Sequence, residues 1–389
     1  MPTVKVLLVD DSLFIRNSLK KILDVPEIKI VDTAQNGQEA VEKNLALNPD
    51  LILLDIEMPI MNGLDALKKI METNPTPVVM FSSLTQEGAQ ETIESLSLGA
   101  LDFIPKQSAY FDLSTVKDDL IKKIVLLGSN AFLRANLKAK YGHLKTGSNA
   151  AEANRKTETN RKTGDSNKAE ANRKSEGEHK ESKIKIVAPG YCQSARKRPS
   201  KENIKLVCIG ISTGGPVALQ EVIPHLPANI PVSILIVQHM PPMFTGSLAK
   251  RLDQNSEITV VEAQDNDDLK PGTVYIGRGG LQMTVTKNHR ISISNQPITE
   301  LFKPSVNVLM NSVVDVYHGD AVGIIMTGMG NDGQKGLTNF ANAGGYVIAQ
   351  SIESCVIGGM PKSVIDAKVA HEIQPLENIA GTIASLFFS

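Results

Sequence analysis

Short apolar runs alternate with amphipathic stretches in the first part of the chain. In the stretches, apolar residues recur at the three- and four-residue spacing of a helix. We expect strands at Val4–Val9, Lys29–Thr33, Leu51–Leu54, Val78–Phe81 and Leu101–Ile104. We expect helices near Phe14–Leu23, Gln38–Leu47, Leu64–Glu72 and Gln90–Leu98, and a longer one at about Leu113–Lys138. Strict alternation with nearly continuous apolar strands predicts a parallel sheet covered by helices on both faces.

The same alternation returns after residue 203. The expected strands are Ile204–Ile209, Ser233–Val237, Val274–Ile276, Val322–Met326 and Tyr346–Ala349. The expected helices are Val217–Ile223, Gly246–Leu252, Val306–Val316 and Gly333–Ala343. A Gly- and Pro-rich stretch, Lys270–Asn295, interrupts the alternation and predicts an inserted β-ribbon. The pattern therefore predicts a second α/β domain with a parallel sheet.

The segment between these two regions has a different composition. From Gly142 to Asn203 it holds 15 Lys and Arg residues against 8 Asp and Glu residues. The sequence AEANRK occurs in it twice, at Ala151–Lys156 and Ala169–Lys174. Such a composition cannot bury enough apolar surface to offset the entropy lost on ordering, so we predict a disordered linker. The expected domains are 1–124 and 204–389, joined by a linker helix and the basic repeat at 125–203.

The overall charge excludes one broad argument about partners. The chain of 389 residues has 41 Lys and Arg against 42 Asp and Glu, a formal net charge of -1, so bulk charge does not favour binding to nucleic acid or a membrane surface. Its three cysteines include no close-spaced pair, which argues against a disulfide framework and fits a reducing cytosol. The sequence shows no signal peptide and no apolar run of the ~20 residues that a membrane span needs. We therefore expect a cytoplasmic protein without direct membrane insertion.

Acidic residues follow two of the predicted strands in the first domain. Asp10 and Asp11 come directly after the first strand, and Asp55 ends the third. Because functional groups gather outside the carboxyl ends of the strands in an open parallel sheet, the three carboxylates should converge. Like charges are unfavourable together unless a cation lies between them, and a cluster of oxygen ligands suits Mg²⁺. Ser82 and Lys106 end the fourth and fifth strands at the same edge, where they could bind a phosphoryl group.

These five residues resemble the signature of a response-regulator receiver domain, over about Val4–Ile124. The resemblance implies a flavodoxin-like sheet and a phosphoryl group that Asp55 accepts from a partner chemotaxis histidine kinase. It implies that Mg²⁺ is held by Asp10, Asp11 and Asp55. It implies that the switch residues of the receiver are Ser82, Phe103 and Lys106. Gln107 is a departure, because the family usually has proline after the lysine.

The first predicted strand of the second domain runs into a glycine-rich turn. Directly after KLVCI come the residues Gly210-Ile211-Ser212-Thr213-Gly214-Gly215. They fit G-x-S-x-G, in which a nucleophilic serine lies on a sharp strand-to-helix turn and the helix N-terminus faces developing negative charge. The dinucleotide-binding pattern would need glycine at position 212, and no G-K-[ST] follows for a phosphate loop. A serine nucleophile is favoured, although glycine-rich turns also serve as plain connections.

Two further strand ends supply candidate partners for this serine. One strand ends in Gln238-His239-Met240-Pro241, and another runs into Thr327–Gly333, where three glycines surround Asp332. Alone, a strand-end histidine is more typical of an ordinary hydrogen-bonding residue, and Asp-Gly of a turn. Together, the three strand ends predict acyl transfer, in which Ser212 attacks, His239 takes its proton and Asp332 orients the imidazole. The order Ser, His, Asp differs from that of α/β-hydrolases, so that fold is not expected.

This second half resembles the catalytic domain of the chemotaxis protein-glutamate methylesterase (CheB) family, over about Lys205–Ile383. The matching segments, in family order, are ISTGGP, QHMPPMFTGSLAKRLD, KPSVNVLMNSV, TGMGNDG and SCVIGGMP. The triad carried over by motif is Ser212, His239 and Asp332. The resemblance implies an oxyanion hole from backbone N–H groups near Thr213 and Met329. The implied reaction is hydrolysis of γ-glutamyl methyl esters on the cytoplasmic domains of methylated chemoreceptors, without a cofactor, with deamidation of receptor glutamines as a second activity.

This half also departs from the family pattern at two places. Gly277-Arg278-Gly279-Gly280 stands where the family usually has an Ala-Pro-Gly turn, and Gln282 stands where a histidine follows. Arg278 adds a cation near the expected rim of the cleft. The two resemblances together suggest that the unphosphorylated receiver packs over the Ser212 crevice. Phosphorylation of Asp55 would then shift the population towards an open form.

Two other classes of function stay open at this point. One is a DNA-binding response regulator whose basic linker contacts phosphates, and the other is a non-catalytic adaptor that keeps the fold. The absence of a short three-helix recognition pattern argues against the first, and the intact triad argues against the second, so we expect no nucleic-acid partner. Rival histidines are His225, in a Pro-flanked loop, and His318, which precedes a strand at the opposite sheet edge.

Overall fold

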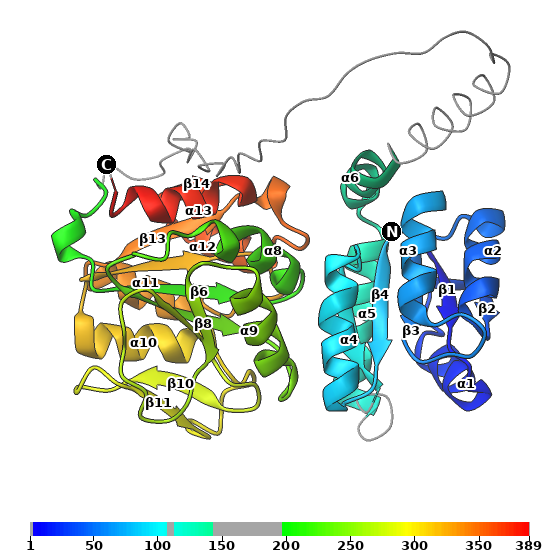
Figure 1. Cartoon of the computed structure of the whole chain (residues 1–389), viewed down its shortest axis with the longest axis horizontal. Helices are drawn as coiled ribbons and strands as arrows, with labels where there is room; N and C mark the ends of the chain where they lie inside the picture. Colours follow the sequence, from blue (N-terminus) through cyan, green and yellow to red (C-terminus); the bar gives the residue numbers. More distant parts are fainter. Residues whose placement is uncertain (1–2, 107–112, 143–196, 389) are drawn as a thin grey trace, which may run out of the picture.

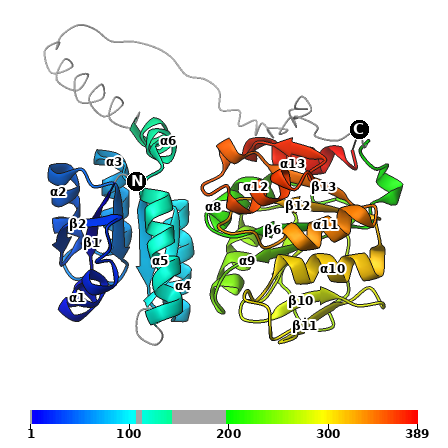
Figure 2. The same ribbon diagram turned by 180° about the vertical axis from the view of Figure 1, so that it is seen from behind.

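The structure is a computed structural model of the chain and describes residues 3–106, 113–142 and 197–388. The predicted disordered repeat, the greater part of the predicted linker and Gln107 lie outside these residues. The described residues form an N-terminal and a C-terminal α/β unit, which lie side by side in both views (Figures 1 and 2).

The N-terminal unit is built on a five-stranded sheet of order β2-β1-β3-β4-β5, and all neighbouring strands are parallel. The strands are β1 (Val4–Val9), β2 (Ile28–Ala34), β3 (Leu51–Asp55), β4 (Val78–Ser82) and β5 (Asp102–Pro105). The helices are α1 (Leu13–Ile22), α2 (Gly37–Leu47), α3 (Gly63–Thr73), α4 (Gln86–Ser97), α5 (Leu113–Gly128) and α6 (Ala131–Gly142). The strand order confirms the predicted flavodoxin-like receiver sheet.

Four receiver helices begin where a polar side chain caps them. The side chains of Ser12, Asn36, Asn62 and Thr85 each accept a hydrogen bond from a backbone N–H in the first turn of α1, α2, α3 and α4. The predicted single helix Leu113–Lys138 was wrong, because α5 ends at Gly128 and the Asn130 side chain caps a separate α6. Helix α5 also crosses the predicted domain boundary at residue 124.

The C-terminal unit is built on a seven-stranded parallel sheet of order β14-β13-β12-β6-β7-β9-β8. Its strands are β6 (Leu206–Ile211), β7 (Ser233–Gln238), β8 (Thr259–Glu262), β9 (Thr273–Ile276), β12 (Ala321–Ile325), β13 (Tyr346–Gln350) and β14 (Glu372–Gln374). Its helices are α8 (Gly215–Val222), α9 (Phe244–Gln254), α10 (Val306–Tyr317), α11 (Gln334–Asn342), α12 (Gly359–Asp366) and α13 (Leu376–Ser385). An antiparallel ribbon of β10 (Gln282–Val285) and β11 (Ile291–Ser294) is inserted before α10.

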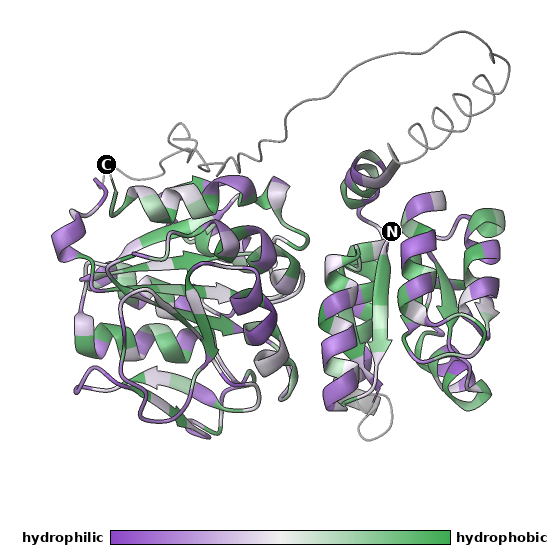
Figure 3. Ribbon diagram, viewed as in Figure 1, coloured by the Kyte–Doolittle hydropathy of each residue, from purple (hydrophilic) through white to green (hydrophobic). Residues whose placement is uncertain are grey.

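The two faces of this sheet are buried by different helices. Along β6, Val207, Ile209 and Ile211 join the hydrophobic cluster that includes α8, α9 and α13. Leu206 and Cys208 join the cluster that includes α10, α11 and α12. This alternation is the period-two pattern of a strand buried on both sides, and Figure 3 shows hydrophobic strands at the centre of each unit.

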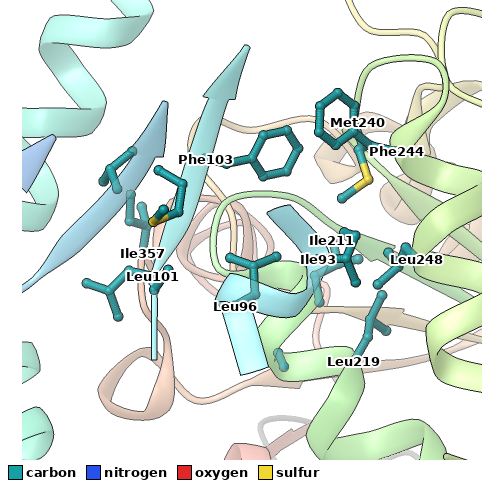
Figure 4. Close-up of a cluster of buried hydrophobic side chains, with 14 of the residues drawn as sticks. Ile93, Leu96, Leu101, Phe103, Ile211, Leu219, Met240, Phe244, Leu248 and Ile357 are labelled. Atoms are coloured by element: carbon teal, nitrogen blue, oxygen red, sulfur yellow. The ribbon is translucent and has the colours of Figure 1, made fainter. Parts of the chain in front are cut away.

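The first of these two clusters continues into the receiver. Figure 4 shows Ile93, Leu96 and Phe103, from α4 and β5, close to apolar side chains of α8 and α9. The rings of Phe103 and Phe244 stack with their centroids 4.5 Å apart. The Ser97 hydroxyl also donates a hydrogen bond to Gln220 Oε1 at 2.6 Å. The two units therefore share one continuous apolar interface.

Four elements of the C-terminal unit were missing from the sequence-based prediction. Strands β8 and β14 are short edge strands with the sequences TVVE and EIQ, in which polar residues hide the strand pattern. Helices α12 and α13 follow the last predicted strand. The expected strand Val274–Ile276 is confirmed as β9 of the main sheet, and the second half of the predicted stretch Lys270–Asn295 forms the ribbon of β10 and β11.

Candidate active site and phosphorylation site

Strand β6 lies at the point where the order of the C-terminal sheet reverses. Its neighbours are β7 and β12, and all three strands end at the same edge. Ser212 follows β6 directly, His239 follows β7 directly, and Asp332 lies in the loop from β12 to α11. An open α/β sheet binds ligands in the crevice at such a reversal. The topology thus brings the three predicted catalytic residues into one crevice.

The three side chains are in direct contact. His239 Nδ1 lies 3.1 Å from Ser212 Oγ, and His239 Nε2 lies 2.8 Å from Asp332 Oδ2. The carboxylate accepts a hydrogen bond from Nε2–H, which leaves Nδ1 free to accept the serine proton. The ring is thus turned relative to chymotrypsin-type triads, in which Nε2 faces the serine. Either orientation gives the serine a base and gives the base an orienting carboxylate.

Asp332 is held in the ionised form. Burial acts to raise the pKa of this carboxyl, but the hydrogen bond from His239 and backbone N–H donors outweigh burial and keep its pKa below the usual value. Those donors are Val306, at 2.7 Å, and Asn307, at 3.1 Å, in the first turn of α10. A negative charge beside His239 would stabilise an imidazolium if the ring took a proton from the serine.

The turn that carries Ser212 depends on glycines. Gly214 has φ 76°, and a Cβ there would lie 2.5 Å from Val356. Gly328 packs so closely that a Cβ would lie 2.8 Å from the Ser212 Cβ. Among the described residues, the backbone N–H groups of Thr213 and Met329 donate to no protein acceptor. The oxyanion hole that the family resemblance implies at these two groups stays a prediction.

The carboxyl ends of the receiver strands carry the second predicted site. Ligand oxygens of Asp10, Asp11 and Asp55 all lie within 4.8 Å of one another. Lys106 Nζ lies 2.7 Å from Asp55 Oδ2 and 3.4 Å from Asp10 Oδ2. Burial raises the pKa of Asp55 to about 7, against the opposing effect of Lys106, and it also raises the pKa of Asp10. Three converging oxygen donors, of which Asp10 and Asp55 are buried, fit a hard divalent cation such as Mg²⁺.

The structure places the three predicted receiver switch residues in three different locations. The Ser82 hydroxyl does not face Asp55: it donates to the backbone oxygen of Gly88 at 3.2 Å and accepts from the Thr92 hydroxyl at 2.6 Å. Phe103 lies at the interface, stacked on Phe244. Lys106 alone of the three contacts the acidic cluster.

Comparison with known proteins agrees with this geometry. Residues 6–116 match the response regulator receiver domain and residues 207–383 match the CheB methylesterase domain. A protein-glutamate methylesterase/protein-glutamine glutaminase of Archaeoglobus fulgidus is 41% identical over 388 residues, which are 98% of this chain and 97% of that protein. The chain belongs to the CheB methylesterase family. A protein of the same description from Bacillus licheniformis is 42% identical over 387 residues, 98% of this chain and 97% of its own.

A solved structure offers a further comparison within the CheB family. The crystal structure described as the Thermotoga maritima CheB methylesterase catalytic domain is 41% identical to this chain. It covers 47% of this chain and 98% of its own, with a TM-score of 0.45. Family membership makes the chain a response-regulator methylesterase, so the DNA-binding alternative is not favoured. Every helix in the described part of the chain is too short or too polar to cross a membrane.

The CheB crevice is covered by the receiver in this structure. A cavity of about 320 Å³ lies between the units. Its catalytic-domain wall includes Ser212, Thr213, Gln238, His239 and Pro241. Its receiver wall includes Asp102, Phe103, Pro105, Leu120 and Lys123. Ser212 and His239 therefore face receiver side chains as well as their own domain.

Sequence reasoning missed residues that support the triad. The Gln238 side-chain nitrogen donates to the backbone oxygens of Ser212, at 3.0 Å, and His239, at 3.1 Å, and so connects the two strand ends. The Phe302 ring stacks on the His239 imidazole. Ser305 caps α10 and donates to Asp332. A serine directly before a predicted helix is a recognisable cap signal, but neither the Gln238 bond nor the Phe302 stack has a sequence signature.

The rival candidates lie away from this constellation. His318 ends α10, before β12, at the opposite edge from Ser212. His225 contacts the backbone oxygen of Glu221. Cys355, a third residue type that could act as a nucleophile, is buried, and burial raises the pKa of its thiol to about 12, which suppresses the thiolate needed for attack. None of the three contacts the triad.

Proposed function

We propose that this methylesterase hydrolyses γ-glutamyl methyl esters of chemoreceptors through a covalent acyl-enzyme on Ser212. The observation that carries the proposal is the imidazole of His239, which touches both Ser212 Oγ and Asp332. As Oγ forms a bond to the ester carbonyl carbon, Nδ1 takes the hydroxyl proton. When the carbon–methoxy bond breaks, His239 gives that proton to the leaving oxygen and methanol departs. Water then attacks the acyl-enzyme by the same route and releases the glutamate side chain and Ser212.

The oxyanion formed in each half-reaction would be bound by backbone donors. The N–H groups of Thr213 and Met329 border the serine and have no protein acceptor among the described residues. Preorganised donors of this kind are typically worth about 3 kcal/mol each in the transition state. A glutamine side chain presents the same carbonyl with ammonia as the leaving group, so deamidation would use the same steps. The relatives' shared description includes both activities.

The receiver would accept a phosphoryl group on Asp55 from a chemotaxis histidine kinase. Asp10, Asp11 and Asp55 would hold Mg²⁺, which neutralises charge on the transferred phosphoryl oxygens when bound. Lys106, already 2.7 Å from Asp55 Oδ2, would pair with a phosphoryl oxygen. Ser82 would have to leave its hydrogen bonds with Gly88 and Thr92 to reach that group.

The receiver would also control access to the triad. Its side chains and the catalytic serine and histidine line the same cavity, which leaves little room for a receptor helix beside Ser212. A new phosphoryl group on Asp55 would compete for Lys106 and disturb β5, the strand that carries Phe103 into the interface. The closed form would then lose population to an open, active form. The substrates would be cytoplasmic domains of methylated receptors, and we place the enzyme in the cytoplasm with them.

Methanol release from membranes that contain methylated receptors tests this function. Wild-type protein should release methanol, and acetyl phosphate with Mg²⁺ should increase the rate. Ser212→Ala should lose activity by at least about 10³-fold, because it removes the nucleophile. Asp55→Asn should keep the basal rate and lose the response to acetyl phosphate. Equal methanol release by wild-type and Ser212→Ala proteins would reject the triad, and a full response of Asp55→Asn would reject the control.

A further inference from the structure

Gln282 is a fully buried side chain on β10 whose two functional ends are both used. Its nitrogen donates to the backbone oxygen of Phe302 at 2.8 Å, and its oxygen accepts from the backbone N–H of Ser305 at 2.8 Å. Both partners lie in the short segment Phe302–Ser305, which leads directly into α10. A buried carboxamide bonded to both ends of this segment fixes its shape, because either partner would otherwise be left unsatisfied.

Each end of the segment contacts a member of the triad. The Phe302 ring lies on the His239 imidazole, with the centroids 4.2 Å apart and the planes within 5° of parallel. At the other end, the Ser305 hydroxyl donates to Asp332 Oδ1 at 3.0 Å. The next backbone N–H, that of Val306, donates to Asp332 Oδ2 at 2.7 Å. One segment thus holds both the base and the carboxylate that orients it.

We propose that Gln282 is a positioning residue for hydrolysis, which acts through Phe302 on His239 and through Ser305 on Asp332. The inference rests on the proposed triad and adds to it a support that no motif identifies. It also gives a role to one of the two departures seen in the sequence, where glutamine stands in place of a histidine. A carboxamide supplies one donor and one acceptor without a charge, which suits a fully buried position.

The stack of Phe302 on His239 explains how Gln282 could affect the reaction. A flat ring against the imidazole restricts its rotation, which keeps Nδ1 on Ser212 Oγ and Nε2 on Asp332. When His239 takes the serine proton, the new positive charge lies against the electron-rich face of Phe302. A misplacement of about 1 Å at a reacting group can cost about 100-fold in rate. Loss of the two Gln282 hydrogen bonds, to Phe302 and Ser305, should therefore lower kcat more than it changes substrate binding.

Gln282→Leu in the full-length protein tests the proposal, with Gln374→Leu as the matched control. Gln374 is 1% exposed, lies on β14, and bonds to Glu372 and Asn378 rather than to the triad. Both variants lose a buried carboxamide and should show similar falls in Tm. With methylated receptor membranes and acetyl phosphate, Gln282→Leu should lower kcat about 10- to 100-fold with KM changed less than about threefold. Gln374→Leu should keep the wild-type kcat.

Two further variants identify the cause of the loss. Phe302→Leu keeps the hydrogen bonds of Gln282 to the backbone and removes only the aromatic stack on His239. It should therefore lower kcat with KM unchanged. Gln282→His still offers one donor and one acceptor and should recover most of the kcat lost in Gln282→Leu. A folded Gln282→Leu variant with the kcat of Gln374→Leu would overturn the proposal, as would equal impairment of the His and Leu variants.

The same assay separates this inference from the function on which it rests. If wild-type protein releases no methanol, or if Ser212→Ala releases as much, the proposed function fails. If Ser212→Ala is inactive while Gln282→Leu behaves like its control, only the positioning role fails.

Discussion

Phe103 is the receiver side chain whose removal should release the catalytic crevice. It is 6% exposed, and its ring stacks on Phe244 of α9 with centroids 4.5 Å apart. Burial of a phenylalanine side chain contributes about 1.5–3 kcal/mol, and an aromatic pair adds about 0.5–1.5 kcal/mol. Part of the burial comes from the receiver itself, so we assign about 2 kcal/mol to contacts between the units. Phe103→Ala should then shift the balance of closed and open forms about 30-fold towards the open form.

The assay for this shift is basal methanol release without a phosphodonor. If the closed form dominates in the unphosphorylated protein, Phe103→Ala should raise the basal rate about 10- to 30-fold. Acetyl phosphate should then add little, because most molecules are already open. Leu133→Ala is the control: Leu133 is 7% exposed in α6 and is not among the residues that line the cavity between the units. It should destabilise the receiver and leave the basal rate unchanged.

Two results would refute this reasoning. A folded Phe103→Ala variant with the wild-type basal rate would show that the interface does not limit access to Ser212. An equal rise in Leu133→Ala would show that general loosening of the receiver, and not the Phe103 contact, controls the crevice.

Three further predictions follow from the pKa shifts and contacts. The raised pKa of Asp55, about 7, means that the Mg²⁺-free folded receiver binds a proton that the unfolded chain does not. Receiver stability should therefore fall by about 1.4 kcal/mol from pH 6 to pH 8 in urea unfolding, and Asp55→Asn should abolish that slope. Asp332→Asn should lower kcat by about 10³- to 10⁴-fold in the methanol-release assay, and it should also lower Tm, because an amide NH2 replaces an oxygen that accepts buried hydrogen bonds. The pKa of Glu372 is lowered because hydrogen bonds from Arg198 and Gln374 outweigh its burial, so the stability that Glu372 contributes is present above about pH 5 and lost as pH falls through its folded pKa. The stability difference between wild type and Glu372→Gln should accordingly shrink on acidification; a constant difference from pH 6 to pH 3 would contradict it.

The sheets and both clusters of strand-end residues could be predicted because their signals are local. Continuous apolar runs mark buried parallel strands, and the carboxyl ends of such strands meet at one edge. This reasoning placed Asp10, Asp11 and Asp55 in one cluster and Ser212, His239 and Asp332 in another, and the structure brings each set together. The edge strands β8 and β14 were missed because they are short and contain polar residues, so neither has a continuous apolar run.

The supports of the site could not be predicted from periodicity. Gln282 reaches Phe302 and Ser305 across twenty or more positions in the chain, and the stack of Phe302 on His239 depends on the path of an irregular segment. A sequence pattern marks where an element begins, but the partner of a buried side chain is decided by tertiary packing. Ser82 shows the same limit: it is at the expected strand end, yet its hydroxyl bonds to α4 and not to the acidic cluster.

Strand β5 connects the acidic cluster around Asp55 with the interface that covers Ser212. It is four residues long, and Phe103 within it stacks on α9 of the catalytic domain. Lys106 follows the strand directly and bridges Asp55 and Asp10 at the receiver edge. Three positions in the chain therefore separate the side chain at the interface from the side chain at the acidic cluster. In a strand this short, we expect a shift of Lys106 to displace Phe103 as well. A phosphoryl group on Asp55 that draws Lys106 away from Asp10 would therefore also shift the position of Phe103 against Phe244. The interface that covers Ser212 would then weaken when the receiver is phosphorylated.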